Sequence, residues 1–317
     1  LYSPLPLYHA SALLIGAGGC ITTRTPMAIR ATFSASAFLP DVRRYDATAM
    51  LYIGELCRYL VSMPPSPSDR DHRVRVAVGN GLRPDVWGPF RDRFGIDDIR
   101  EFYTATEAPG FLVNLGAVPG VVGREPKRGL GWMKLARYDV DEDEHVRDAD
   151  GFCVEASPDE PGELLIRLPT KQSVPGLDFR GYTDQKATNA KILTDVFAKG
   201  DKWFRSGDLL RQDDLGFYAF VDRIGDTYRC KGENVSTSEI ADVLSMADSV
   251  KEVAVVGVKV PPHDGQFGLA VVVPNGELDL VAFARAAATL PGYAQPRFIR
   301  VVTEMPVTST HKQQKAQ

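Results

Sequence analysis

Short apolar runs alternate along this chain with segments of helical spacing, and this alternation is the feature that most limits its fold. The runs with the composition of buried strands are Val74–Val78, Gly162–Leu168, Phe217–Val221, Val253–Val260 and Leu269–Val273. The helical segments between them are Tyr52–Ser62, Arg83–Phe94, Ala187–Val196, Glu239–Met246 and Leu280–Thr289. The alternation predicts an α/β architecture, and 317 residues suffice for about two domains.

The charge balance argues against a nucleic-acid partner, and the length of the apolar segments argues against a membrane span. With 37 basic and 41 acidic side chains, the net charge of −4 offers no basic surface for a nucleic acid. The most apolar segment, Ala12–Ile21, falls well short of the roughly 20 apolar residues that cross a bilayer. We therefore predict no nucleic-acid partner and no membrane span in this chain.

The four cysteines are sparse and scattered, which excludes a disulfide framework or a CxxC metal site. We expect them to be buried thiols in a reducing, intracellular compartment. They are Cys20, Cys57, Cys153 and Cys230.

Two helix starts have a local mechanism. Ser236 and Glu239 have the spacing of a capping box, in which hydroxyl and carboxylate each satisfy an unpaired backbone donor. Asp184 is similarly placed to cap the helix that follows it.

Two further segments imitate ligand-binding motifs. The acidic run Asp139–Asp150 has Glu144 where a calcium loop needs glycine, so we predict a solvated hairpin there. The cluster Gly16–Gly19 has Ile21 where a dinucleotide fingerprint needs glycine, so we predict a turn of small residues.

Six polar motifs follow one another in a fixed order, and each alone is typical of an ordinary turn or surface loop. They are VGNGL at 78–82, EFYTATE at 101–107, WFRSGDL at 203–209, VDRIGD at 221–226, KGEN at 231–234 and PVTSTHK at 306–312. Their collinear order is the informative feature, together with LPLYHAS at 5–11, TAMLYIGELCRYL at 48–60 and PRFIRVV at 296–302.

This series resembles the adenylate-forming superfamily of acyl-CoA synthetases, most closely its fatty-acid-transport-protein or very-long-chain acyl-CoA synthetase branch. The resemblance implies a large α/β AMP-binding domain over residues 1–222, lacking its N-terminal part. It also implies a small, mobile α+β domain over 223–317, hinged to the first.

The implied chemistry has two steps and needs ATP, Mg²⁺ and coenzyme A. A fatty or related lipophilic carboxylate attacks ATP to give an acyl-adenylate and pyrophosphate, and the thiol of coenzyme A then displaces AMP. Two alternatives stay open: an acyl-AMP ligase that loads a carrier protein in secondary metabolism, and a non-catalytic remnant that only binds nucleotide.

The resemblance also assigns nucleotide-binding residues. An aromatic ring would stack on adenine, because every base presents a π face. Glycines and an amide would edge the same ring. A carboxylate would accept hydrogen bonds from the ribose hydroxyls, and an arginine would contact the ribose or a phosphate. The aromatic residue is Tyr103, the glycines and the amide are Gly79, Gly81 and Asn80, the carboxylate is Asp208 and the arginine is Arg223.

Three residues are assigned to catalysis by the same resemblance. Thr106 would contact the α-phosphate, and Glu107 would hold Mg²⁺, a cation that binds few carboxylates and keeps phosphate oxygens as ligands. Lys312 would bridge the substrate carboxylate and the α-phosphate during attack.

The remaining assignments concern movement and the acyl group. Asp222 would mark the hinge, and His9 would lie at the floor of the acyl pocket or else be an ordinary core histidine. The loop expected to replace Lys312 for thiolation consists of Lys231, Gly232, Glu233 and Asn234.

The chain also departs from the family pattern. The phosphate-gripping loop is expected upstream of residue 1, so the chain resembles a central-to-C-terminal portion of a synthetase. Thr104 and Ala108 stand where glycines are usual, and Ser309 and His311 flank the catalytic lysine in place of a glycine and an aromatic residue. By resemblance the compartment is the peroxisome, the endoplasmic reticulum or the cytoplasm, and the sequence carries no address signal.

Overall fold

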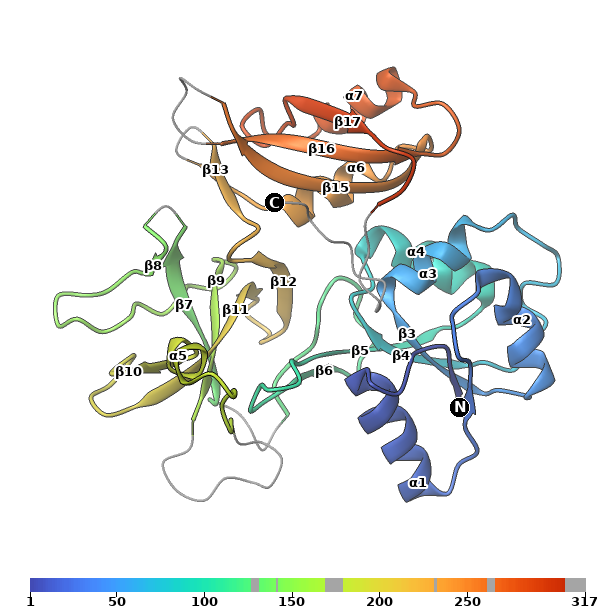
Figure 1. Cartoon of the computed structure of the whole chain (residues 1–317), viewed down its shortest axis with the longest axis horizontal. Coiled ribbons are helices and arrows are strands. Elements are labelled where there is room, and N and C mark those ends of the chain that lie inside the picture. Colours follow the sequence, from blue (N-terminus) through green and yellow to red (C-terminus); the bar gives the residue numbers. More distant parts are fainter. Residues whose placement is uncertain (127–130, 141, 169–178, 231–232, 261–265, 306–317) are drawn as a thin grey trace. The chain divides into compact units, whose positions relative to one another are not determined.

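The computed structural model describes residues 1–126, 131–140, 142–168, 179–230, 233–260 and 266–305 (Figure 1). Within these residues the chain forms two compact units. Unit 1 contains Leu1–Tyr103 and Val113–Gly123, and unit 2 contains Thr104–Leu112 and Arg124–Met305.

Unit 1 is built on a sheet with the strand order β2-β1-β3-β4-β5-β6. The strands are β1 (Tyr2–Ser3), β2 (Ala28–Ile29), β3 (Ala49–Ile53), β4 (Val76–Asn80), β5 (Asp98–Tyr103) and β6 (Leu112–Asn114). The first five pair in parallel, as the predicted α/β alternation requires. Because parallel strands end at the same edge, the turns that follow β4 and β5 are neighbours.

Three helices of unit 1 share one core with this sheet: α2 (Ala35–Arg44), α3 (Gly54–Ser62) and α4 (Pro84–Phe94). In Figure 1, α3 and α4 lie side by side. Alternate residues of β3 serve different cores, since Met50 and Tyr52 pack with the three helices. Leu51 and Ile53 instead pack with Ala12, so both faces of this strand are buried.

The predicted turn at Gly16–Gly19 is wrong, because these residues lie in a helical segment. A π-type helix, η1 (Ser11–Gly18), runs directly into α1 (Gly19–Thr23). A Cβ on Gly16 would lie 2.8 Å from Met27 Cε and 2.9 Å from Leu51 Cδ1. The glycine therefore allows the helix to approach β3, a packing requirement that the sequence pattern does not reveal.

Unit 2 begins with an antiparallel sheet of strand order β10-β11-β9-β7-β8, to which β12 adds by pairing with β11. The pairing of β7 with β8 confirms the hairpin predicted in the acidic run 139–150. The strands are β7 (Met133–Asp139), β8 (Glu144–His145), β9 (Gly162–Arg167), β10 (Ile192–Thr194), β11 (Lys202–Gln212) and β12 (Tyr218–Arg223).

The helix α5 (Gln185–Ala190) begins and ends earlier than the predicted range of 187–196. The carboxylate of Asp184 accepts the N–H of Lys186 at 2.8 Å, which confirms the predicted cap. The predicted continuation to Val196 is wrong, because residues 192–194 form β10 and pair with 202–204. Sheet pairing with a distant segment outweighs the local helical spacing.

The rest of unit 2 combines a two-stranded and a three-stranded sheet with two helices. The hydroxyl of Ser236 accepts the N–H of Glu239 at 3.1 Å, the first of the two bonds of the predicted capping box. The elements are β13 (Tyr228–Cys230), β14 (Glu233–Val235), α6 (Thr237–Leu244), β15 (Val250–Lys259), β16 (Gln266–Pro274), α7 (Leu280–Ala288) and β17 (Phe298–Val301).

Two further sequence predictions can be compared with the fold. All four cysteines are buried and free, as expected. Among the described residues, none of the helices has both the length and the apolar character needed to cross a bilayer.

We predict that Gly54→Ala destabilises unit 1 strongly. A Cβ at this position would lie 1.7 Å from the carbonyl oxygen of Gly81, so the backbone must shift. The matched control is Gly88→Ala within α4, where a Cβ meets no described residue within 4 Å and alanine favours the helix by about 1 kcal/mol. Urea unfolding followed by tryptophan fluorescence should show a lower midpoint for Gly54→Ala and an unchanged or higher one for Gly88→Ala. Equal midpoints would contradict this account of the close approach.

Candidate functional site

The turn after β4 carries three of the predicted nucleotide-binding residues. Gly81 has a left-handed φ of +74°, and a Cβ there would meet none of the described residues within 4 Å. Gly79 differs, because a Cβ there would lie 2.2 Å from the backbone oxygen of Tyr52 and 2.6 Å from Cγ of its ring. Gly79 thus makes room for a neighbouring ring, whereas Gly81 leaves its outer side open.

Asn80, between these glycines, has an unpartnered acceptor. Its Oδ1 is buried, and no group among the described residues donates a hydrogen bond to it. Buried polar atoms are almost always paired, so such an atom beside an open glycine is a candidate ligand contact.

Tyr103 ends β5, the strand next to β4, and is half-buried. The strands pair in parallel, with Gly79 opposite Glu101. The structure therefore brings the predicted stacking ring and the glycine turn to the same edge of the unit 1 sheet.

The loop 104–110, in unit 2, is held by its own hydrogen bonds. The Thr104 hydroxyl donates to the carbonyl of Gly110 at 3.1 Å. Thr106 is exposed, and the carboxylate of Glu107 accepts the hydroxyl of Tyr182 at 2.8 Å. Burial and this hydrogen bond to Glu107 raise the pKa of Tyr182 to about 12, so the tyrosine remains a donor at neutral pH.

Asp208, the predicted ribose contact, and Arg223, the predicted ribose or phosphate contact, are brought together on adjacent strands. They are paired across β11 and β12, and Arg223 Nε lies 3.6 Å from Asp208 Oδ1. The pairing of β11 with β9 shifts register between Arg205 and Leu209, where Gly207 has a φ of +81°. This bulge interrupts the pairing of β11 with β9 at Asp208, while Asp208 stays paired with β12.

A buried glutamate, which sequence reasoning missed, holds this bulge in place. Glu163 on β9 is fully buried and accepts hydrogen bonds from Arg205 and from the N–H of Gly207 at 3.1 Å. Burial disfavours its ionised form, but hydrogen bonds from His145 and Arg205 outweigh burial and hold the pKa of Glu163 below its usual value. Only the strand pattern GELLIR, with one acid in an apolar run, signals it in the sequence.

Asp222, the predicted hinge, lies within β12 and is almost fully buried. Its carboxylate accepts the N–H of Thr237 at 2.6 Å and the hydroxyl of Ser238 at 3.0 Å. The aspartate therefore serves the N-terminus of α6, where a negative charge is stabilised by unpaired N–H groups.

For the other predicted residues, the structure gives only partial information or none. Lys312, Lys231 and Gly232 lie outside the described residues. The backbone of Glu233 and Asn234 forms part of β14, which pairs with β13. In unit 1, Nδ1 of His9 accepts the N–H of Ser11 at 3.2 Å, a local contact that assigns no ligand to it.

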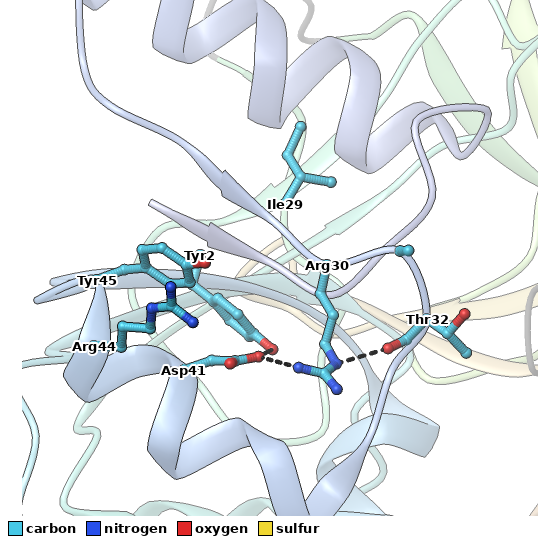
Figure 2. A pocket seen from close by; sticks show the side chains of 8 residues that line it. Tyr2, Ile29, Arg30, Thr32, Asp41, Arg44 and Tyr45 are labelled. Atoms are coloured by element: carbon cyan, nitrogen blue, oxygen red, sulfur yellow. Dashed lines mark hydrogen bonds and ion pairs between the residues drawn. The ribbon is translucent and has the colours of Figure 1, made fainter.

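An open pocket of about 430 Å³ in unit 1 has none of the predicted site residues in its lining (Figure 2). One of its two arginines is paired, since Arg30 donates to Asp41 at 2.6 Å and Tyr2 donates to the same carboxylate at 3.1 Å. The remaining lining is Ile29, Ala31, Thr32, Arg44 and Tyr45.

Comparison with family models gives two matches. Residues 1–176 match the model described as AMP-binding enzyme, and residues 239–312 match the AMP-binding enzyme C-terminal domain. The first match covers more than half of the chain.

Several relatives are similar over nearly the whole chain. Long-chain fatty acid transport protein 2 of Rattus norvegicus is 44% identical over 99% of this chain and 51% of its own length. Medium/long-chain-fatty-acid–CoA ligase FadD6 of Mycobacterium tuberculosis is 41% identical over 100% of this chain and 52% of its own length. The chain thus spans about half the length of these relatives.

Solved structures share the fold at lower identity. ATP-bound MatB from Rhodopseudomonas palustris aligns with a TM-score of 0.76 at 22% identity, over 99% of this chain and 58% of that one. A benzoate CoA ligase from Burkholderia xenovorans LB400 aligns with a TM-score of 0.73 at 23% identity, over 99% of this chain and 60% of that one.

We predict that Glu163→Gln removes a pH-dependent part of the stability of unit 2. The folded pKa of Glu163 lies below the unfolded value of 4.5, so its contribution is complete above pH 4.5 and is lost as the pH falls through the folded value. Above pH 5 the substitution should lower the free energy of unfolding by about 2 kcal/mol, and the difference should shrink in more acidic solution.

The matched control is Glu160→Gln, which weakens the half-exposed ion pair with Arg137 and should cost less than about 1 kcal/mol. Denaturant unfolding of the three proteins between pH 3 and pH 7 measures both effects. A Glu163→Gln cost that stayed constant down to pH 3 would show that its charge is not involved.

Proposed function

Because the chain belongs to the AMP-binding enzyme family, we propose that it carries the nucleotide-binding part of an ATP-dependent acyl-CoA synthetase acting on fatty or related lipophilic carboxylic acids. The observation that carries the proposal is the buried Oδ1 of Asn80, which has no hydrogen-bond partner among the described residues and lies beside Gly81. The names of the relatives, a fatty acid transport protein and a fatty-acid–CoA ligase, support the substrate class.

The residues of unit 1 fit an adenine ring. The Oδ1 of Asn80 is an acceptor that the exocyclic amino group of adenine can satisfy. Tyr103 would stack on one face of the base, and the missing side chain of Gly81 leaves room for a planar ligand.

The residues of unit 2 fit the ribose and the phosphates. The carboxylate of Asp208 would accept hydrogen bonds from the ribose hydroxyls, with Arg223 beside it as a second contact. The hydroxyl of Thr106 would donate to the α-phosphate. Lys312 would provide the ammonium group that stabilises the charge developing there.

Glu107 is the residue that would hold Mg²⁺. The ion would neutralise phosphate charge. The described residues contain no cluster of three His, Cys, Asp or Glu that could hold a metal, so phosphate oxygens would supply other ligands of the ion. The hydrogen bond from Tyr182 fixes the orientation of the Glu107 carboxylate before any ion is bound.

The second half-reaction rests on the remaining residues. We propose Asp222 as the hinge position, with its side chain tied to α6. Lys231, Gly232, Glu233 and Asn234 would replace Lys312 at the phosphate during thiolation, and His9 would border the acyl group. Coenzyme A is the proposed acceptor.

ATP–pyrophosphate exchange tests the proposed activity directly. The purified chain with Mg²⁺ and a long-chain fatty acid should exchange labelled pyrophosphate into ATP, and exchange should require the acid. Adding coenzyme A should then release acyl-CoA; release only with a phosphopantetheinyl carrier protein would indicate the carrier-loading alternative. AMP binding without exchange would indicate a nucleotide-binding module instead.

We predict that Asp208→Ala weakens AMP binding by about tenfold, the cost of a lost hydrogen bond to a charged group. The effect should be confined to the ribose, so the affinity for free adenine should not change. The control is Asp214→Ala, an exposed acid between β11 and β12 that should leave both affinities unchanged. Isothermal titration of each variant with both ligands makes the comparison, and equal losses for adenine and AMP would rule out a ribose-specific role.

A further inference from the structure

Glu101 is a buried carboxylate to which neither the sequence nor the proposed function assigns a role. It lies on β5, two residues before Tyr103, and only 5% of its surface is exposed. Its Oε1 accepts the N–H of Leu82 at 2.8 Å and the hydroxyl of Tyr52 at 3.3 Å. A group this deeply buried affects whatever its hydrogen bonds hold.

Those hydrogen bonds hold the glycine turn. Leu82 directly follows Gly81, and its N–H would otherwise be a buried donor without an acceptor. Tyr52 fills the space left by Gly79, so the same ring supports the turn at one end and donates to Glu101 at the other. All of these contacts lie within unit 1.

We infer that Glu101 is a positioning residue for the nucleobase, which acts by fixing the turn that carries Asn80 in register with Tyr103 on its own strand. The inference rests on the proposed nucleotide site and extends it to a residue that does not touch the ligand. The strand that carries Tyr103 thereby also holds the turn that carries Asn80.

The charge state of Glu101 gives this role a measurable signature. Burial raises the pKa of Glu101 to about 7, although the hydrogen bonds from Leu82 and Tyr52 oppose that change. Among the described residues, the titratable neighbours are Tyr52 on β3 and Cys57 on α3. Burial and the charge of Glu101 hold the pKa of each well above its ordinary value, so both stay neutral between pH 6 and pH 8.

The ionised carboxylate is the stronger acceptor for the Leu82 N–H, so the turn should be held less firmly as the pH falls through about 7. Adenosine is the appropriate probe, because it lacks the phosphate that itself titrates near this pH. Its affinity for the wild-type chain should fall several-fold between pH 8 and pH 6.

Three variants test the inference. Glu101→Ala should weaken adenosine binding at pH 8 by about tenfold, because it leaves a buried donor unsatisfied. Glu101→Gln keeps an uncharged acceptor, so it should bind within a few-fold of wild type and show no pH dependence between pH 6 and pH 8. The control is Asp69→Asn, which changes another buried carboxylate of unit 1 that accepts from Ser66 and Arg93 and should leave adenosine binding unchanged.

The outcomes separate this inference from the proposed function. If the wild-type chain binds neither adenosine nor AMP, the proposed site fails. If it binds them and Glu101→Gln retains the wild-type pH profile, or if Asp69→Asn weakens binding as much as Glu101→Ala, the positioning role of Glu101 is wrong. Should Glu101→Ala fail to fold, the pH profile of Glu101→Gln still decides.

Discussion

A buried carboxylate that accepts a backbone N–H from outside its own strand is the interaction on which the local geometry depends. Glu101 holds the turn at Leu82, Glu163 holds the bulge at Gly207, and Asp222 holds the start of α6 at Thr237. Turns and bulges leave N–H groups outside the sheet ladder, and a buried one is costly without an acceptor. A strand side chain can supply that acceptor because the strand fixes its position.

The two glutamates differ in what surrounds the charge. Arg205 and His145 lie against Glu163, so its ionised form is favoured in spite of burial. Glu101 has neutral donors, Leu82 N–H and Tyr52, and burial is the larger effect. One carboxylate therefore remains a fixed anion at neutral pH, whereas the other is poised between its two forms.

The sequence pattern predicted most of the architecture, because apolar periodicity is a local signal. The collinear motifs named the residues of the candidate site, such as those of the turn after β4. It failed where a distant segment decides. The register shift at Gly207 depends on β9, and the role of Gly16 depends on Leu51. Of the two glycines predicted to edge the adenine ring, Gly81 has no described residue within 4 Å of a Cβ, whereas at Gly79 the ring of Tyr52 fills the corresponding space. Lys312 remains a prediction from the resemblance.

The departure from the family pattern at Thr104 can now be interpreted physically. Its hydroxyl donates to the carbonyl of Gly110, within the loop that carries Glu107. A Cβ on Gly110 would lie 2.7 Å from Met133 Cε, so that end of the loop packs closely on the unit 2 sheet. The Thr104 hydroxyl is therefore used within the loop, and Tyr182 fixes Glu107 in the same region. A loop held by its own hydrogen bonds loses less entropy when a ligand binds, so the added hydroxyl favours preorganisation of the proposed phosphate and metal contacts.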